Sequence, residues 1–243
     1  MNTEMGNQKS LLITIDGPAG AGKTTVSRML ASHLDFLYVD TGALYRGVAF
    51  EVFSREIDPE NDRELEKIVP DLNLQFEYSN KGTRLVLKGD DITDRIRTPE
   101  ITMLASKVSA SPIIRNALLD VQKQMGARKS AVFEGRDMGT VVFPDADVKF
   151  FLTADVKARA MRRFTEYGDG GKQCFDEVLE DMVKRDADDS SRAIAPLRPA
   201  DDAIIIDSSG LSPDSVVEKM IEHINSARPK TRILGQDQGR RKF

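Results

Sequence analysis

Residues 15–24 read IDGPAGAGKT and follow the apolar run Leu11–Ile13. From Gly17 to Thr24 the stretch has the form Gly-x-x-x-x-Gly-Lys-Thr, and the next dozen residues carry apolar side chains at helical spacing. A strand, a glycine loop and a helix in this order let backbone N–H groups converge on phosphate oxygens at the helix N-terminus. The stretch therefore predicts a phosphate-binding loop, with the Lys23 ammonium on the terminal phosphates and the Thr24 hydroxyl on Mg²⁺.

Outward from this loop, short apolar runs alternate with amphipathic stretches of helical length. This pattern is typical of an α/β fold, a five-stranded parallel sheet covered by helices on both faces. A further helix is expected from Ser212–Pro213 to about Ala227, because proline suits the first helical position. The predicted strands are Leu11–Ile15, Phe36–Val39, Ala131–Glu134, Val148–Leu152 and Ala203–Ile206.

Two regions interrupt the alternation. Between Asp71 and Arg97, period-two apolar residues flank the turn SNKG at 79–82, which predicts a small β-hairpin inserted in the α/β core. The glycine-rich GDGGK at 168–172 separates two charged helical stretches, as in a mobile hairpin arm. The polar start and the basic segment 228–243 are expected to be disordered tails.

Composition limits the functional classes. With 243 residues, 40% of them apolar, the chain is long enough for one large domain. The net charge is −4, so we expect no nucleic-acid partner apart from a weak contact through the basic tail. No apolar stretch suits a membrane span or a secretion signal, which favours a cytoplasmic protein. The single Cys174 and the separated His33 and His223 do not form a metal-binding pattern.

A phosphate-binding loop alone does not choose between a switch, a motor and a transferase. The Asn-Lys-x-Asp motif of GTP-binding switches does not occur in the sequence, and motor ATPases are generally larger. The chain instead carries many arginines away from the loop, which suits a second phosphorylated substrate and the charge of a transferring phosphoryl group. These arginines are Arg46, Arg115, Arg136, Arg159, Arg162, Arg163, Arg185 and Arg192.

Five spaced motifs then carry a family resemblance from about Leu11 to Ile224. They are IDGPAGAGKTT at 15–25, VDTGALYRG at 39–47, RIRTPE at 95–100, FEGRDMGTVVFPDADVKFFL at 133–152 and KRDADDSSRAIAPLRPADDAIIID at 184–207. In this order they resemble the bacterial cytidylate kinases, P-loop enzymes that make CDP from CMP and ATP. The resemblance implies a nucleoside monophosphate kinase fold in a single domain, residues 11–227. This domain would contain an inserted acceptor-binding region at about 41–112 and a helical lid at about 157–192. Segments 1–10 and 228–243 would flank it.

The resemblance also implies roles for matching positions. The ATP phosphates would be held by Gly17, Pro18, Ala19, Gly20, Ala21, Gly22, Lys23, Thr24 and Thr25. CMP would be bound by Thr41, Arg46, Ser106, Arg115, Arg136, Asp137, Asp189 and Arg192, with Ser106, Arg115 and Asp137 at the cytosine. Together with Lys23, the lid residues Arg159, Arg163 and Arg185 would be catalytic. This chain has threonine at 41 where serine is common, and Glu134 where aspartate is more frequent, so a role of Glu134 at Mg²⁺ stays open.

The implied reaction is direct in-line transfer from MgATP to CMP and dCMP by a monomer. Two alternatives remain at this point. One is a kinase with a broader acceptor range, of the UMP/CMP or adenylate type. The other is a P-loop protein that binds partners in a nucleotide-dependent way without transferring phosphate. Tyr45 and Phe50 are expected in the core and not as platforms for a base.

Overall fold

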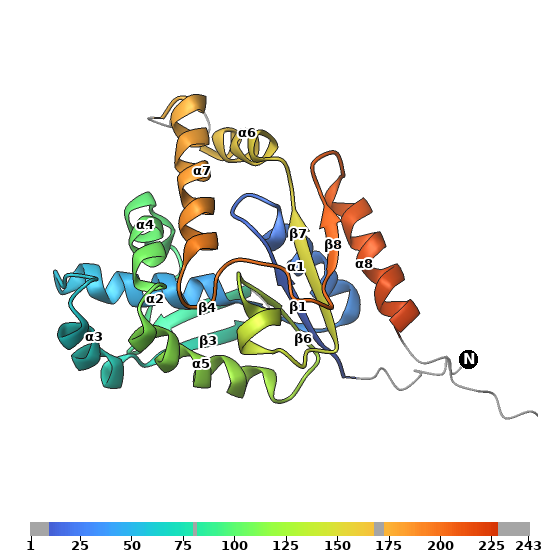
Figure 1. The fold of residues 1–243 in the computed structure, drawn as a ribbon. Helices are drawn as coiled ribbons and strands as arrows, with labels where there is room; N and C mark the ends of the chain where they lie inside the picture. Colours follow the sequence, from blue (N-terminus) through green and yellow to red (C-terminus); the bar gives the residue numbers. More distant parts are fainter. Residues whose placement is uncertain (1–9, 80–81, 168–172, 228–243) are drawn as a thin grey trace, which may run out of the picture.

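The computed structural model describes residues 10–79, 82–167 and 173–227 (Figure 1). Its centre is a parallel sheet of five strands, which confirms the predicted α/β fold class. In order across the sheet the strands are β2 (Leu37–Asp40), β6 (Ala131–Glu134), β1 (Leu12–Asp16), β7 (Val148–Thr153) and β8 (Ile204–Asp207). Strand β1, which leads into the glycine loop, is therefore central and paired on both sides.

Four of these strands reach one residue beyond the end that the apolar pattern predicts. The added residues are Asp16, Asp40, Thr153 and Asp207, all polar. They lie at the carboxyl edge of the sheet, where ligands bind open parallel sheets. An apolar pattern tends to end a strand at its last apolar residue, so the predicted strand ends too early where a polar residue at the last ladder position faces a site.

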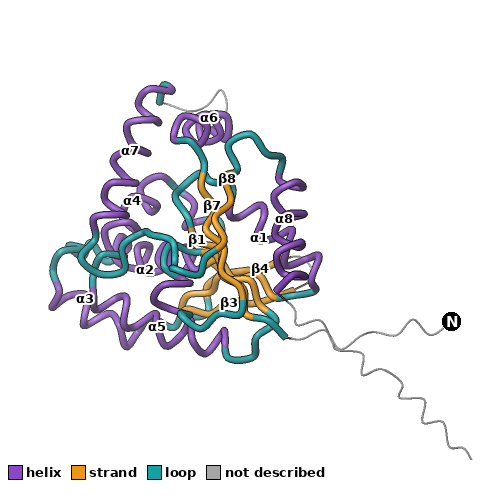
Figure 2. Tube along the Cα trace, turned by 45° about the vertical axis from the view of Figure 1, so that its right-hand side comes forward, coloured by secondary structure: helices purple, strands orange, loops and turns teal. Residues whose placement is uncertain are grey.

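The helices α1 (Lys23–Leu34) and α8 (Pro213–Ala227) cover one face of the sheet, and their buried residues form one core with Ile13, Ile15 and Phe150. The predicted helix from Ser212–Pro213 to Ala227 is confirmed by α8. The other face packs against the single-turn π-helix η3 (Met138–Val142) and α5 (Pro112–Gly126). Figure 2 shows the strands of the sheet between α1 and α8 on one side and α5 on the other.

The inserted region has its own sheet and core. Strands β3 (Leu74–Ser79) and β4 (Gly82–Leu87) form the predicted antiparallel hairpin, and the short β5 (Asp90–Asp91) extends it. The core of this region contains Tyr45, as expected, and Phe50 packs against it. Its other elements are α2 (Thr41–Ser54), α3 (Asp62–Ile68), η1 (Val69–Asp71), η2 (Arg95–Arg97) and α4 (Pro99–Val108).

Helices α6 (Val156–Tyr167) and α7 (Phe175–Ser191) form a pair beyond the carboxyl edge of the sheet (Figure 1). Ala160, Val178 and Met182 are the buried residues between them, and Ala19 of the glycine loop packs against this small core. The predicted arm at 168–172, the turn residues 80–81 and the tails 1–9 and 228–243 lie outside the described residues. Among the described helices, none is long and apolar enough to cross a membrane.

Candidate active site

The glycine loop lies between β1 and α1. Gly17 has a φ of +145°, and a Cβ atom there would lie 1.9 Å from the carbonyl oxygen of Leu152, so only glycine fits. Gly22 caps α1 in the left-handed region, at φ +90°, and supplies no side chain to the first amides of the helix. These amides, and the positive end of the helix dipole, remain available to phosphate oxygens.

The Lys23 side chain is buried in this loop. Its Nζ donates to the carbonyl oxygen of Pro18 at 2.7 Å. Burial lowers the pKa of Lys23 well below 10.5, the guanidinium groups of Arg136 and Arg185 lower it further, and the carboxylates of Glu134 and Asp16 act against them. The ammonium is thus held close to other cations, an arrangement that favours an incoming anion.

Thr24 and Glu134 meet beside the loop. The Thr24 hydroxyl donates to Glu134 Oε1 at 2.7 Å, and the Tyr38 hydroxyl donates to Glu134 Oε2 at 3.0 Å. Burial, and then the nearby carboxylate of Asp40, raise the pKa of Glu134, while Lys23 and the two hydroxyl donors lower it. A hydroxyl and a carboxylate at this separation are hard oxygen donors, so the residues present fit Mg²⁺ bound together with phosphate.

A network of charged side chains joins the end of β6 to α7 and α4. Arg136 Nε donates to Asp189 Oδ2 at 3.0 Å, and Arg192 donates to the other oxygen of the same carboxylate. Arg192 also lies 3.4 Å from the Ser106 hydroxyl. Burial alone would raise the pKa of Asp189, but Arg136, Arg192 and Arg185 hold it below 3.8. Four of the predicted site residues are therefore brought into contact.

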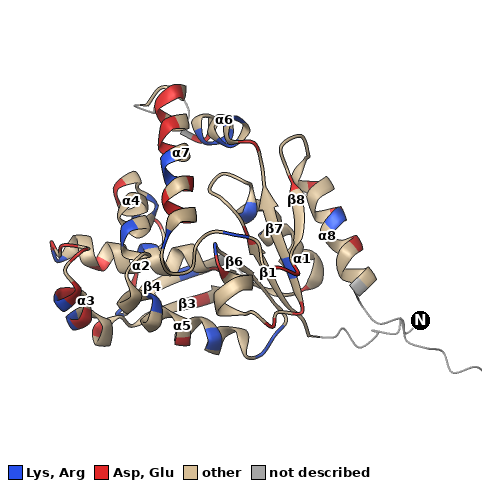
Figure 3. Cartoon of the chain, viewed as in Figure 1, with Lys and Arg blue, Asp and Glu red and all other residues tan. Residues whose placement is uncertain are grey.

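Arg185 adds a further cation to this network. Burial, and then repulsion from Arg136, lower its pKa to about 10, and the Asp189 carboxylate opposes them. Arg163 and Arg46 make smaller contributions that also lower it. Its Nε has no hydrogen-bond partner among the described residues. Figure 3 shows Lys and Arg on α6, on α7 and at the end of β6, on the side of the molecule where the glycine loop lies. This surplus of positive charge suits phosphate groups.

The other two predicted lid arginines are placed differently. Arg159 is buried, and its guanidinium contacts both oxygens of Asp186, at 3.1 and 2.6 Å, and the Ala19 carbonyl at 3.1 Å. These bonds fasten α6 to α7 and to the glycine loop. Arg163 lies 3.1 Å from Glu166 on the same helix. Of the three predicted lid arginines, only Arg185 is among the named contributors to the pKa of Lys23, whereas Arg159 ties α6 to Asp186 and to the glycine loop.

The predicted cytosine-contacting residues Arg115 and Asp137 form a buried ion pair. Arg115 also donates to the Ser109 carbonyl at 3.1 Å, and its guanidinium lies 5.7 Å from the centre of the Tyr45 ring. Burial raises the pKa of Asp137 against the opposing effect of Arg115. Asp137 does not pair with its neighbour Arg136, because Arg136 turns to Asp189.

Two further predicted residues are engaged at the start of α2. Arg46 pairs with Asp40 at 2.7 Å, and Asp40 also caps the helix by accepting from the Ala43 amide at 3.0 Å. The Thr41 hydroxyl donates to the Glu134 backbone carbonyl at 2.7 Å. These contacts bring the end of β2 to the end of β6, beside the glycine loop.

Several residues of this region were not predicted from sequence. Asp16 accepts hydrogen bonds from two backbone amides beyond β6, and Tyr38 holds Glu134. Arg162, named from the sequence only as one of the arginines away from the loop, donates to the Ser208 carbonyl at 2.6 Å and lies 3.4 Å from the Gly20 carbonyl. A polar residue at the carboxyl end of a predicted buried strand is the signal that would have indicated Asp16.

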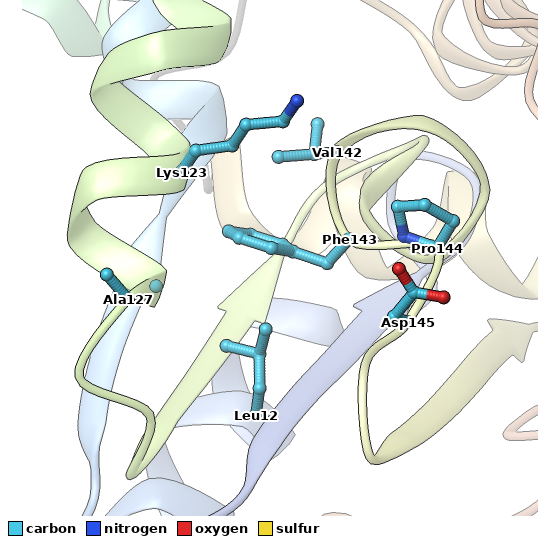
Figure 4. Close-up of a pocket in the computed structure, with 8 residues that line it drawn as sticks. Leu12, Lys123, Ala127, Val142, Phe143, Pro144 and Asp145 are labelled. Atoms are coloured by element: carbon cyan, nitrogen blue, oxygen red, sulfur yellow. The ribbon is translucent and has the colours of Figure 1, made fainter.

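A separate shallow pocket of about 310 Å³ lies between α5 and the segment after η3 (Figure 4). It contains none of the predicted site residues, and its lining includes Leu12, the first residue of β1. The glycine loop follows the last residue of the same strand. The pocket is therefore at the opposite end of the sheet from the candidate active site.

Comparisons with known proteins agree with these observations. The family model for cytidylate kinase matches residues 13–226. The cytidylate kinase of Geobacter sulfurreducens is 45% identical over 214 residues, which cover 88% of this chain and 92% of that protein. The cytidylate kinase of Shewanella denitrificans is 39% identical and covers 91% and 99% of the two chains. A shikimate kinase structure from Acinetobacter baumannii, with 17% identity and a TM-score of 0.45 over 92% of this chain and 97% of its own, is too remote to add to the argument.

The matched region contains the glycine loop, the inserted region with its hairpin, and the helices α6 and α7. It therefore includes both the elements expected to hold ATP and those expected to hold the acceptor. The chain belongs to the cytidylate kinase family.

Proposed function

We propose that this protein transfers the γ-phosphoryl group of ATP to CMP, and also to dCMP, giving CDP and dCDP. The observation that carries this proposal is the family match over residues 13–226, because it spans donor loop and acceptor region together. The cations around Lys23, Arg136 and Arg185 support it, since they converge where two phosphorylated substrates would have to meet.

In this proposal the loop from Gly17 to Thr25 holds the ATP phosphates. Lys23 neutralises charge on the β- and γ-phosphates, and Thr24 and Glu134 are the residues that would hold Mg²⁺. Mg²⁺ bound with ATP would supply further positive charge at the phosphates. The chain needs no covalent intermediate, because a phosphate oxygen of CMP attacks the γ-phosphorus in line once both substrates are oriented.

The acceptor is bound by residues that the inserted region, β6 and α7 bring together. The phosphate and the sugar of the acceptor are bound by Arg46, Arg136, Asp189 and Arg192. Thr41 lies beside them, where β2 and β6 end. Arg115, Asp137 and Ser106 contact the base. We further propose that the inserted region and the pair α6–α7 move inward over both substrates and exclude water, which would otherwise accept the phosphoryl group.

The proposal is tested by release of ADP with each candidate acceptor. We expect ADP release to depend on CMP, with CMP and dCMP far ahead of UMP and AMP in kcat/KM. Equal activity with all four acceptors would contradict the proposed acceptor, and ADP release that is indifferent to every acceptor would contradict phosphoryl transfer itself. Sedimentation in the same buffer tests the accompanying proposal that the enzyme is a monomer.

Replacing Arg185 with alanine is expected to lower kcat by about tenfold and to change KM for CMP by less than about threefold. The guanidinium acts on the transferring group, and its removal relieves repulsion with Arg136, so the fold should be retained. The measurement is steady-state kinetics of Arg185→Ala. The control is Arg63→Ala, on the exposed side of α3. The lid assignment is wrong if kcat is unaltered in Arg185→Ala and also in the alanine variants of Arg159 and Arg163.

ATP binding is expected to take up protons in the pH range between the pKa of Lys23 in the free protein and its pKa in the complex. In the free protein the pKa of Lys23 lies well below 10.5, and triphosphate beside the ammonium raises it again. Between these two values free Lys23 has lost protons that the complex retains, so affinity falls as the pH rises through this window. Calorimetry in buffers with different ionisation enthalpies measures the uptake. Heats that do not depend on the buffer, or an uptake that persists in Lys23→Met, would contradict this assignment.

A further inference from the structure

Asp16 is a buried carboxylate that none of the proposed roles uses. It is the last residue of β1, directly before Gly17, and is 4% exposed. Because side chains alternate along a strand, Asp16 shares a face with Leu12 and Thr14 and points away from the core that contains Ile13 and Ile15. That face is the one against which η3 packs.

Both carboxylate oxygens of Asp16 are used by the start of η3. The Met138 amide donates to Oδ1 at 2.9 Å, and the Gly139 amide donates to Oδ2 at 2.7 Å. These are the first two residues of the π-helix, and its own capping position, Asp137, makes no side-chain cap because its carboxylate pairs with Arg115. The cap of η3 is therefore supplied by another element, the central strand.

The packing around these bonds leaves little room for movement. A Cβ atom on Gly139 would lie 3.0 Å from the Thr14 hydroxyl and 3.4 Å from Asp16 Oδ2. Burial raises the pKa of Asp16 to about 6, the amides of Gly139 and Met138 lower it, and the charges of Asp137 and Lys23 act in opposite directions. Burial of a carboxylate is unfavourable unless it is hydrogen-bonded, and both oxygens of Asp16 accept hydrogen bonds from consecutive backbone amides. These bonds fix the backbone that follows Asp137.

We propose that Asp16 is a positioning residue for the acceptor: by holding the amides of Met138 and Gly139, it sets where Arg136 and Asp137 meet CMP. The inference rests on the proposed function, because it assigns these two side chains to the acceptor. Asp16 directly precedes the glycine loop that holds ATP, yet in this proposal it acts on the acceptor site. The end of β1 thereby connects the donor half of the active site to the acceptor half.

The selectivity of the effect distinguishes positioning from general stability. Both hydrogen bonds described for the Asp16 side chain go to the segment after β6. On the donor side, its charge makes the smallest of the named contributions to the pKa of Lys23. Loss of the carboxylate should therefore weaken binding of the acceptor more than binding of the donor. A residue that only stabilises the fold would affect both substrates together, or neither.

The test replaces Asp16 with asparagine, which keeps one oxygen acceptor and turns an amide hydrogen toward the other backbone N–H. By calorimetry with each substrate alone, we expect the Kd for CMP to rise about tenfold and the Kd for ATP to stay within about twofold. KM values should separate in the same way. Equal weakening of CMP and ATP, or no change in either, would overturn the proposal.

A matched control comes from the other end of β1. The Asp147 carboxylate accepts from the Leu12 amide at 2.8 Å and pairs with Lys129, far from the loop. Asp147→Asn therefore removes a comparable bond to the same strand, and we expect Kd for CMP and ATP to remain at the wild-type values. A selective loss of CMP binding in this variant as well would overturn the assignment to Asp16.

Gly139→Ala decides the question if Asp16→Asn does not fold. It retains the carboxylate and pushes η3 a few tenths of an ångström away from β1. The same selective rise in Kd for CMP supports the proposal, and unchanged CMP binding in a folded Gly139→Ala protein overturns it. Failure of the proposed function would look different, because the wild-type enzyme itself would not phosphorylate CMP.

Discussion

Replacing Lys23 with methionine is expected to lower kcat with MgATP and CMP by a factor on the order of 10² or more. The side chain keeps its length and loses the ammonium that offsets charge on the transferring phosphoryl group. The fold should be largely intact, because among the described residues the buried Nζ donates one hydrogen bond, to the Pro18 carbonyl, and because burial of the ammonium is itself unfavourable. Single-turnover kinetics of the purified variant measures the loss of catalysis, and thermal unfolding tests whether the fold is retained.

Lys149→Met is a close control for this experiment. Lys149 is 7% exposed and Lys23 is 6% exposed, and each donates to the carbonyl of a proline five residues earlier. Lys149 lies on β7 and pairs with Asp202, outside the candidate active site. We expect this variant to lose stability and keep kcat. Near-normal turnover in Lys23→Met would remove the loop lysine from the mechanism.

Replacing Asp137 with asparagine is expected to narrow the preference for CMP over UMP by about 1 to 3 kcal/mol, the usual scale of a contact to a base edge. Cytosine presents an exocyclic amine where uracil has a carbonyl, so a carboxylate attracts the first and repels the second. Asparagine is nearly isosteric, removes the charge and offers a donor that uracil can accept. The measurement is kcat/KM for both acceptors in wild type and variant.

The structure sharpens the competing interpretation of Asp137. The carboxylate pairs with buried Arg115, so its removal also leaves that guanidinium without its partner. A purely structural role would lower activity with CMP and UMP together and leave their ratio unchanged. Asp186→Asn provides the comparison, since it unpairs another buried arginine, Arg159, and we expect it to act equally on both acceptors. An unchanged ratio in Asp137→Asn rules out base reading by this residue.

The main sheet was predictable because its strands are apolar runs flanked by helical patterns, and the glycine loop fixes the first strand and helix. The ion pairs of the site were not. Arg136 and Asp137 are adjacent in sequence, which suggests a mutual pair, but they find separate partners in Asp189 and Arg115. Those partners come from α7 and α5, and no local pattern states which helix returns to the end of β6.

The lid shows a similar limit. Arg159, Arg162 and Arg163 lie within one turn or so of the same helix, so the sequence alone treats them alike. The fold separates them, because the first is tied to Asp186 and the loop, the second to Ser208, and the third lies beside Glu166. Which arginine meets a phosphate depends on tertiary placement and on substrate, and the kinetic tests above address it.

The crowding at Gly17 affects how the glycine motif should be interpreted across a lineage. A Cβ atom at this position would collide with the Leu152 carbonyl of the neighbouring strand, whether or not a nucleotide is bound. Selection for folding alone would therefore preserve Gly17 in a descendant that had lost its activity. Lys23 and Arg185 carry a cost of burial without substrate, so they would be free to drift in such a descendant. In a related sequence, retention of these cations is therefore better evidence of catalytic activity than retention of Gly17.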